Sequence, residues 1–346
     1  MDSADLFDVT IIGGGPAGMF SAFYAGLREM KTKIIEAQPQ LGGKVTVYPE
    51  KIIWDVGGLT PIRGAQLIEQ LTEQALTFEP TLALGEKVTS IARSGDGTFI
   101  IHTSSGEKHF TKTIILAIGG GILKPIKLEI EGAERYEVTN LHYTVQSLER
   151  FRDKTVLLSG GGNAAVDWAN ELEPIAKKVY LTYRNDTFKA HEAEVSKLVA
   201  SSVECLYNTT IEKLIASPDH ERIETVILQG VEGQESAVAV DEVVVNHGFE
   251  RERELLENSE VKVEIESEIY VAGNPVGETS VPGVFAAGDV LHHEGKLKLI
   301  AGAFHDAGNA VNRAKHFISP EAGDRAVVST HNERFKERNR VLANNF

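Results

Sequence analysis

Two short glycine-rich turns are the residues of this chain with the clearest chemistry. The first, at 13–18, follows the apolar stretch 7–12, and the second, at 160–165, follows the apolar stretch 155–159. Each has the spacing G-x-G-x-x-G/A, in which backbone N–H groups at the start of a helix hold a pyrophosphate. The sequence therefore predicts two dinucleotide sites in one chain, and two dinucleotides suggest a hydride that passes between them.

The residues after the first turn favour an adenosine site. We expect a helix over 17–30 and a strand over 32–36, and Glu36 at the end of that strand lies where an acid bonds a ribose hydroxyl. The alternative is a glycine turn in an ordinary strand–helix–strand unit, with Glu36 merely exposed. The turn, the helix and the acid at this distance together favour the nucleotide site.

The second unit carries different residues at the place of Glu36. Alignment of the two turns puts Tyr183 there, followed by Arg184 and later by Lys189. Because the ribose 2′-hydroxyl finds no acid and a cation stands beside it, the site favours NADPH over NADH. The alternative for Arg184 is an ordinary solvated charge.

The chain has a single cysteine, Cys205. One cysteine makes neither an internal disulfide nor a dithiol relay, and this usage fits a reducing cytoplasm. Cys205 lies in the alternating stretch 203–207, which predicts a strand in which the thiol is a small core residue.

Composition and charge argue against several kinds of partner. The 346 residues include 35 basic and 50 acidic ones, and the net charge of −15 argues against nucleic acid or an anionic membrane as the main partner. The acidic start lacks the features of a signal peptide, and no apolar run approaches the roughly 20 residues of a membrane span. The histidines and acids within 292–306 match no zinc spacing, so we expect no metal site. The lack of a signal peptide and the single cysteine together lead us to expect a cytoplasmic protein.

The pattern of strands and glycines predicts an α/β fold of two Rossmann-like, three-layer domains, one inserted into the other. A strand over 113–118 ends at glycines 119–121, a strand over 241–245 ends at 246–249, and these points bracket the second unit. The expected domains are a first dinucleotide domain of 1–119 and 246–318, a second of 120–245, and a C-terminal extension of 319–346.

Four segments, at 13–18, 41–44, 117–119 and 284–290, resemble the FAD domain of low-molecular-weight thioredoxin reductases. In those enzymes the reduced flavin passes electrons to a Cys-x-x-Cys pair, but the corresponding stretch 140–146 contains no cysteine. The chain is therefore similar to the thioredoxin-reductase-like ferredoxin–NADP reductases of bacteria, which hand electrons directly to an outside acceptor. In such a fold the 120–245 domain is the NADPH domain.

The resemblance implies roles for particular residues. Asp289 would bond the ribityl chain of FAD, and a helix starting near Ile300 would face the N1 and O2 edge of the isoalloxazine ring. Tyr48 would stack on that ring; the alternative is that Tyr48 is an ordinary surface or core tyrosine. The residues expected at FAD are Gly13, Gly15, Pro16, Ala17, Gly18, Glu36, Gln38, Gly43, Lys44, Tyr48, Val88, Ile118, Gly119, Asp289, Ile300, Ala301 and Thr330. Those expected at NADPH are Gly160, Gly162, Asn163, Ala164, Arg184 and Lys189.

The extension from residue 319 onward is polar, and plain thioredoxin reductases lack it. By resemblance, the protein is a homodimer in which the extension covers the open flavin face of the partner subunit. His331 is the candidate for the contact with the ring, so His331 and Tyr48 are the two residues expected to act there. A shift of one residue along the chain would put Thr330 in the place of His331. The alternative is a chain end without a role.

The expected activity is electron transfer by FAD between NADPH and ferredoxin or flavodoxin, in either direction. The alternatives are a reductase of another acceptor such as a quinone, and a flavin redox sensor with low turnover. Ferredoxins are usually acidic, so a protein of net charge −15 needs segregated charges to bind one. The residues of a candidate basic patch are Lys44, Lys51, Arg63, Lys296, Lys298 and Arg313.

Overall fold

The chain divides into two compact units, each described here by itself. The first comprises residues 1–46, 51–122 and 251–346, and the second comprises residues 47–50 and 123–250. The computed structural model describes residues 6–122, 124–250, 253–266, 270–326 and 331–343.

These bounds differ in detail from the domains expected from the sequence. The first stretch of the first unit runs to residue 122 instead of 119, and the chain returns to it at 251 instead of 246. The segment 47–50 groups with the second unit, although the expected bounds place it in the first domain.

The main sheet of the first unit is largely parallel. Among the described residues it has seven strands: six follow the order β5-β2-β1-β8-β7-β6, and the seventh, β21, pairs with β8. The elements of this unit are β1 (Leu6–Ile12), α1 (Pro16–Leu27), β2 (Thr32–Glu36), η1 (Gly43–Val47), β3 (Ile52–Ile53), β4 (Ile62–Arg63), α2 (Gly64–Ala75), η2 (Leu76–Phe78), β5 (Thr81–Leu84), β6 (Val88–Arg93), β7 (Phe99–Thr103), β8 (Lys108–Leu116), α5 (Glu254–Asn258), β19 (Ile265–Glu266), β20 (Tyr270–Ala272), β21 (Val284–Ala286), η5 (Gly288–Val290), β22 (Leu291–His292), α6 (Ile300–Ile318), η7 (Glu333–Phe335) and α7 (Lys336–Ala343).

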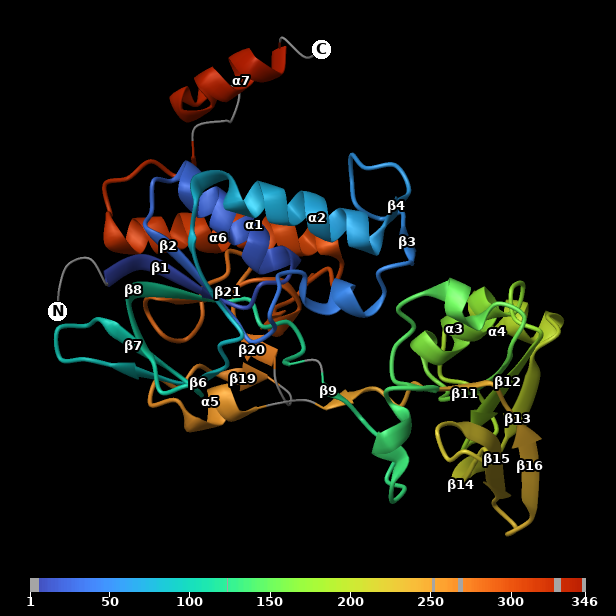
Figure 1. The fold of residues 1–346 in the computed structure, drawn as a ribbon. Coiled ribbons are helices and arrows are strands. Elements are labelled where there is room, and N and C mark those ends of the chain that lie inside the picture. The colour runs from blue at the N-terminus through green and yellow to red at the C-terminus, as the bar shows by residue number, and fades with distance from the viewer. Residues whose placement is uncertain (1–5, 123, 251–252, 267–269, 327–330, 344–346) are drawn as a thin grey trace. The chain divides into compact units, whose positions relative to one another are not determined.

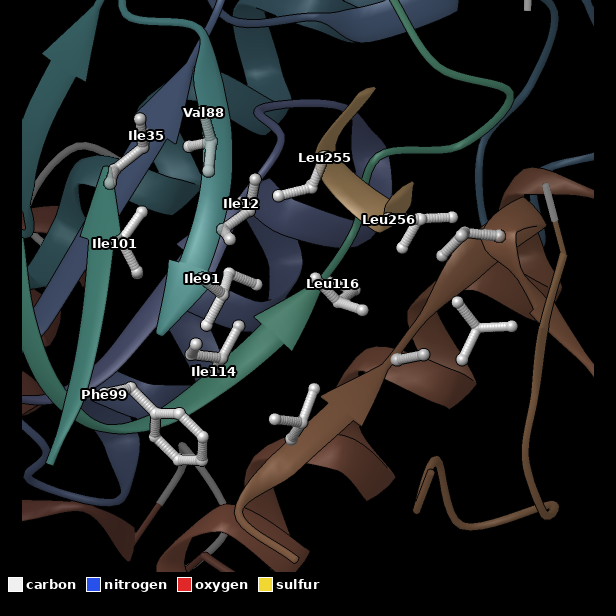
Figure 2. Close-up of a cluster of buried hydrophobic side chains, with 14 of the residues drawn as sticks. Ile12, Ile35, Val88, Ile91, Phe99, Ile101, Ile114, Leu116, Leu255 and Leu256 are labelled. Atoms are coloured by element: carbon white, nitrogen blue, oxygen red, sulfur yellow. The ribbon is translucent and has the colours of Figure 1, made fainter. Parts of the chain in front are cut away.

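Both faces of this sheet are covered. Helices α1, α2 and α6 lie on one face (Figure 1). On the other face, side chains such as Ile91, Ile114 and Leu116 form a core cluster with Leu255 and Leu256 of α5 (Figure 2). Because the central strand β1 is buried on both sides, its sequence is apolar without strict alternation.

The C-terminal part of the first unit packs on α1. Arg28, which follows α1, donates to the carbonyl oxygen of Gly323 at 2.8 Å. The ring of Phe335 lies 6.4 Å from that of Phe23 on α1 and 5.3 Å from that of Phe78, measured between centroids. These contacts fix η7 against the outer side of the helical layer.

The second unit is built on a parallel sheet of its own, whose described strands have the order β10-β17-β11-β12-β13. A separate antiparallel sheet has the order β14-β15-β16. The elements are β9 (Lys124–Pro125), η3 (Ala133–Tyr136), β10 (Leu141–His142), η4 (Leu148–Phe151), β11 (Thr155–Ser159), α3 (Asn163–Leu172), β12 (Lys178–Tyr183), α4 (Glu192–Ala200), β13 (Glu204–Tyr207), β14 (Thr209–Ala216), β15 (Ile223–Gly230), β16 (Glu235–Ala239), β17 (Glu242–Val245) and β18 (Phe249–Glu250).

Two core clusters account for the layers of the second unit. One joins Leu158 of β11 to Val166 and Trp168 of α3, and the other joins Leu157 to Leu228 of β15. Neighbouring residues of β11 thus point to opposite faces of the sheet, as a strand requires. The predicted α/β fold, with two units that each carry a sheet of their own, is confirmed. None of the helices in the described ranges has the length and apolar character needed to cross a bilayer.

Candidate functional site

The first glycine turn connects β1 to α1 in a conformation that requires glycine. Gly13 has φ +106°, and a Cβ there would lie 2.4 Å from the carbonyl oxygen of Ala117. A Cβ at Gly18 would lie 1.9 Å from the carbonyl oxygen of Gly13, so the helix packs directly on the strand end. Gly15 is the N-cap and Pro16 the first residue of α1, and no side chain of the described residues caps this helix start. Its first-turn N–H groups fit a phosphate.

Glu36, at the end of β2, is held against this turn. Its Oε2 accepts the backbone N–H of Gly14 at 2.6 Å, its Oε1 accepts that of Gln38 at 2.8 Å, and only 8% of the residue is exposed. The carbonyl oxygen of Gln38 in turn accepts the N–H of Gly85 at 2.9 Å, which brings the start of β6 near this edge. The carboxylate is thereby oriented at the turn, where a ribose hydroxyl would be a further donor. The side chain of Val88 lies in the core cluster (Figure 2), which leaves its main chain for any contact with a nucleotide.

Two further segments lie next to the first turn. Gly42 donates its N–H to the carbonyl oxygen of Gly14 at 2.8 Å, and Gly43 and the exposed Lys44 then begin η1. Ile118 and Gly119 follow β8, the strand that pairs with β1. The structure therefore brings both predicted segments to the end of β1.

The turn that carries Asp289 packs on the start of α1. Gly288 has φ +77°, and a Cβ there would lie 2.8 Å from the Cβ of Ala17. Asp289 is half-buried in η5, which contacts α6, and α6 begins at Ile300 and Ala301 without a capping side chain from the described residues. The starts of α1 and α6 and the Asp289 turn, all expected at FAD, thus belong to one connected site.

The second glycine turn has the same construction. Gly160 donates its N–H to the carbonyl oxygen of Thr182 at 3.0 Å, and α3 begins at Asn163 and Ala164. Gly162 is the N-cap, and within the described residues no side chain caps α3. This helix start also fits a phosphate.

The loop after β12 is tied to the second turn. Lys189 donates its N–H to the carbonyl oxygen of Gly161 at 2.7 Å, and the Tyr183 ring packs so closely that a Cβ at Gly161 would lie 2.2 Å from it. Arg184 follows Tyr183, and the side chains of Arg184 and Lys189 are exposed. Two cations therefore stand at the edge of the sheet that carries the phosphate turn.

His247 also lies at this edge, and no motif in the sequence marks it. Its Nε2 lies 2.8 Å from Oγ of Ser159, the last residue of β11. Removal of the ring from water lowers the pKa of His247, and the charge of Arg184 lowers it further. The available signal was the segment 246–249 at the end of the strand over 241–245, which above indicates only a domain boundary.

The predicted ring contacts fall in different parts of the chain. Tyr48 lies in the segment 47–50 of the second unit and is half-buried against the core cluster that contains Trp168. His331 is exposed, and Thr330 lies outside the described residues. Stacking of Tyr48 and cover by His331 or Thr330 remain predictions.

The cations of the expected basic patch are partly engaged elsewhere. Lys296 is buried in an ion pair with a carboxylate of α6, Arg313 donates to Glu278 at 2.7 Å, and Lys298 lies 3.6 Å from the ring centroid of Tyr270. The structure therefore does not present these cations as one exposed, unpaired patch. Within the described ranges, no group of three His, Cys, Asp or Glu side chains could hold a metal ion.

The chain matches the model of the pyridine nucleotide-disulphide oxidoreductase family over residues 7–308. It is 63% identical over 343 residues to ferredoxin–NADP reductase 1 of Bacillus mycoides (strain KBAB4), a match that covers 99% of this chain and 98% of the relative. It is 61% identical over 343 residues to ferredoxin–NADP reductase 2 of Exiguobacterium sibiricum, covering 99% of this chain and 97% of the relative.

Among solved structures, the fold is similar to thioredoxin reductase of Lactococcus lactis in its FR conformation. The TM-score is 0.75 at 26% identity, with 91% of this chain and 99% of the other covered. These matches confirm the resemblance to thioredoxin reductases and the reductases related to them. Because the family model matches most of its length, the chain belongs to the pyridine nucleotide-disulphide oxidoreductase family.

Proposed function

We propose that this protein is a ferredoxin–NADP reductase that uses FAD to transfer electrons between NADPH and ferredoxin or flavodoxin. The observation that carries the proposal is the 63% identity to a ferredoxin–NADP reductase over 99% of the chain. The single cysteine supports it, since the flavin has no dithiol in this chain to which it could pass electrons.

Bound FAD accepts two electrons together from a nicotinamide and releases them one at a time, which is the chemistry that this reaction needs. In the balanced reaction, one NADPH and two oxidised ferredoxins give NADP⁺, two reduced ferredoxins and one proton. The chain's own residues bind and orient the two dinucleotides.

The first unit supplies the proposed FAD site. The start of α1 would hold the pyrophosphate, and Glu36, already oriented by Gly14 and Gln38, would accept from the adenosine ribose. Asp289 would accept from the ribityl hydroxyls, and the start of α6 at Ile300 would donate to the pyrimidine edge of the flavin.

The second unit supplies the proposed NADPH site. The start of α3 would hold the second pyrophosphate, while Arg184 and Lys189 would contact the 2′-phosphate. Both cations are exposed beside the turn, so they reach a ligand there without breaking a buried contact.

We further propose a cytoplasmic homodimer. In the dimer, Tyr48 would stack on one face of the flavin, and the segment containing Thr330 and His331 would cover the other face from the partner subunit.

The test is anaerobic reduction of the purified protein by NADPH, followed by rapid mixing with ferredoxin, flavodoxin and thioredoxin. We expect flavin absorption to return on mixing with ferredoxin or flavodoxin and not with thioredoxin. Rapid reoxidation by a quinone alone, or slow reoxidation by every carrier, would support the alternatives of another reductase or a redox sensor.

A further inference from the structure

One carboxylate oxygen of Asp306 holds three segments of the first unit together. Asp306 lies on α6 and Lys296 in the loop before it, and their side chains form an ion pair in which 5% and 3% of the respective side-chain surfaces are exposed. The same oxygen, Oδ2, accepts the backbone N–H of Gly288 at 3.0 Å. Asp306 thus ties η5, the loop 293–299 and α6 to one another.

Stability alone does not account for this buried ion pair. Removing two charges from water is costly, and apolar side chains of similar volume often stabilise a fold equally well or better. The pair does restrict geometry, because Asp306 meets both partners only when η5 and the loop keep fixed positions relative to α6. The close packing of Gly288 on Ala17 further limits movement of η5.

We propose that Lys296 and Asp306 are positioning residues of the flavin site. This inference rests on the proposed function, because it takes FAD to bind at the starts of α1 and α6. Asp289 directly follows Gly288, and α6 starts shortly after Lys296, at Ile300. The ion pair therefore fixes the positions of Asp289 and of the start of α6, and it acts on the flavin only through these two segments.

The flavin should sense a displacement of either segment. N–H groups at a helix start stabilise nearby negative charge, and this effect falls off within the first turn. A shift of the start of α6 would therefore change the relative stability of the oxidised and reduced cofactor, and a shift of Asp289 would weaken FAD binding.

The test compares the holoenzyme with D306N, K296M and the double variant K296M with D306L. D306N retains an acceptor oxygen without the charge. The double variant replaces the pair by apolar side chains and keeps the test decisive if a single variant leaves a buried charge and does not fold. We expect these variants to bind FAD about tenfold more weakly than the unmutated protein, or weaker still, as is found when groups that orient the ligands of a bound metal are removed. We also expect the flavin absorption band and the reduction potential to shift.

R313Q is the matched control, because it removes an exposed ion pair with Glu278 from the same helix. Its FAD affinity, spectrum and potential should equal those of the unmutated protein. A folded double variant with all three properties unchanged would overturn the inference alone. Failure of the unmutated protein to bind FAD would instead overturn the proposed function, and the inference with it.

Discussion

Glu36 and Gly14, 22 positions apart in the chain, are joined by a hydrogen bond of 2.6 Å from the Gly14 N–H to Oε2 of the carboxylate. The other oxygen accepts the N–H of Gln38. The acid that we propose for the ribose is therefore also part of the construction of the phosphate turn. A change at Glu36 affects the shape of the turn as well as the direct contact.

Glu36→Gln tests this double role. The amide has a single acceptor oxygen, so either Gly14 or Gln38 loses its partner and faces an NH₂ group instead. Hydrogen bonds to charged groups contribute about 1.5–3 kcal/mol, so we expect the FAD dissociation constant to rise roughly tenfold or more. Titration with FAD, followed by flavin fluorescence, measures it. D96N is the control, because the Asp96 carboxylate accepts the backbone N–H of Thr98 in an exposed turn of the same unit. Equal FAD affinities for E36Q and the unmutated protein would contradict the proposed role of Glu36.

Arg184→Ala should raise the KM for NADPH and leave that for NADH nearly unchanged. Loss of a direct bond to the 2′-phosphate costs roughly 1.5–3 kcal/mol. Steady-state kinetics with both nucleotides measure this difference. R152A is a suitable control because Arg152 precedes β11 and pairs with the exposed Glu149, at the strand end away from the turn. Equal use of both nucleotides by the unmutated protein would count against the assignment.

His247 provides a test of the same cation without a nucleotide. Burial is the main cause of its lowered pKa, and the positive charge of Arg184 disfavours the protonated ring further. Arg184→Ala removes that repulsion, so the pKa of His247 should rise toward the ordinary value of a histidine in water. NMR titration of the ring, assigned with H247Q, measures the change. An unchanged or lower pKa in R184A, with R152A as the reference, would show that the charge of Arg184 does not act on the ring.

The sequence predicts those parts of the candidate site that are made by residues close to one another in the chain. The first turn, α1 and Glu36 all fall within 13–36, so glycine spacing, Pro16 and a strand-end acid are enough to identify them. Arg184 is likewise found from its distance to the second turn. Such local signals also predict the α/β fold, because each turn implies a strand before it and a helix after it.

Contacts between distant residues leave no such pattern. Ser159 and His247 are 88 positions apart, and Asp306 meets the backbone of Gly288 only because α6 returns over the sheet. The grouping of 47–50 with the second unit also lacks a signal, since four residues carry no composition of their own. These features depend on which strands become neighbours, and residue types alone do not specify that.

Cys205→Ser should retain electron transfer. The thiol is half-buried in β13, and burial raises its pKa, so the reactive thiolate is disfavoured. Reoxidation of the NADPH-reduced protein by ferredoxin should proceed at the rate of the unmutated protein in rapid-mixing experiments. Loss of transfer from a folded C205S protein would overturn direct transfer from the flavin to the carrier.

Removal of residues 327–346 tests whether the extension covers a flavin. This truncation keeps Gly323, whose carbonyl oxygen accepts from Arg28, and so preserves part of the packing on α1. If the extension lies over the flavin of the partner subunit, its removal should expose the ring, change flavin fluorescence and alter the rate of flavin reduction by NADPH. Anaerobic rapid mixing with NADPH measures that rate.

Two point variants separate the cover from the packing of the extension. H331A and T330A leave Phe335 in place against Phe23 and Phe78, so the anchor of η7 on the helical layer is retained. If one of these side chains faces the ring, its variant should reproduce part of the change in reduction rate while the melting temperature stays the same. A folded truncation with unaltered fluorescence and reduction kinetics would show that the extension has no role at the flavin, and Phe335 would then serve only to hold the chain end on α1.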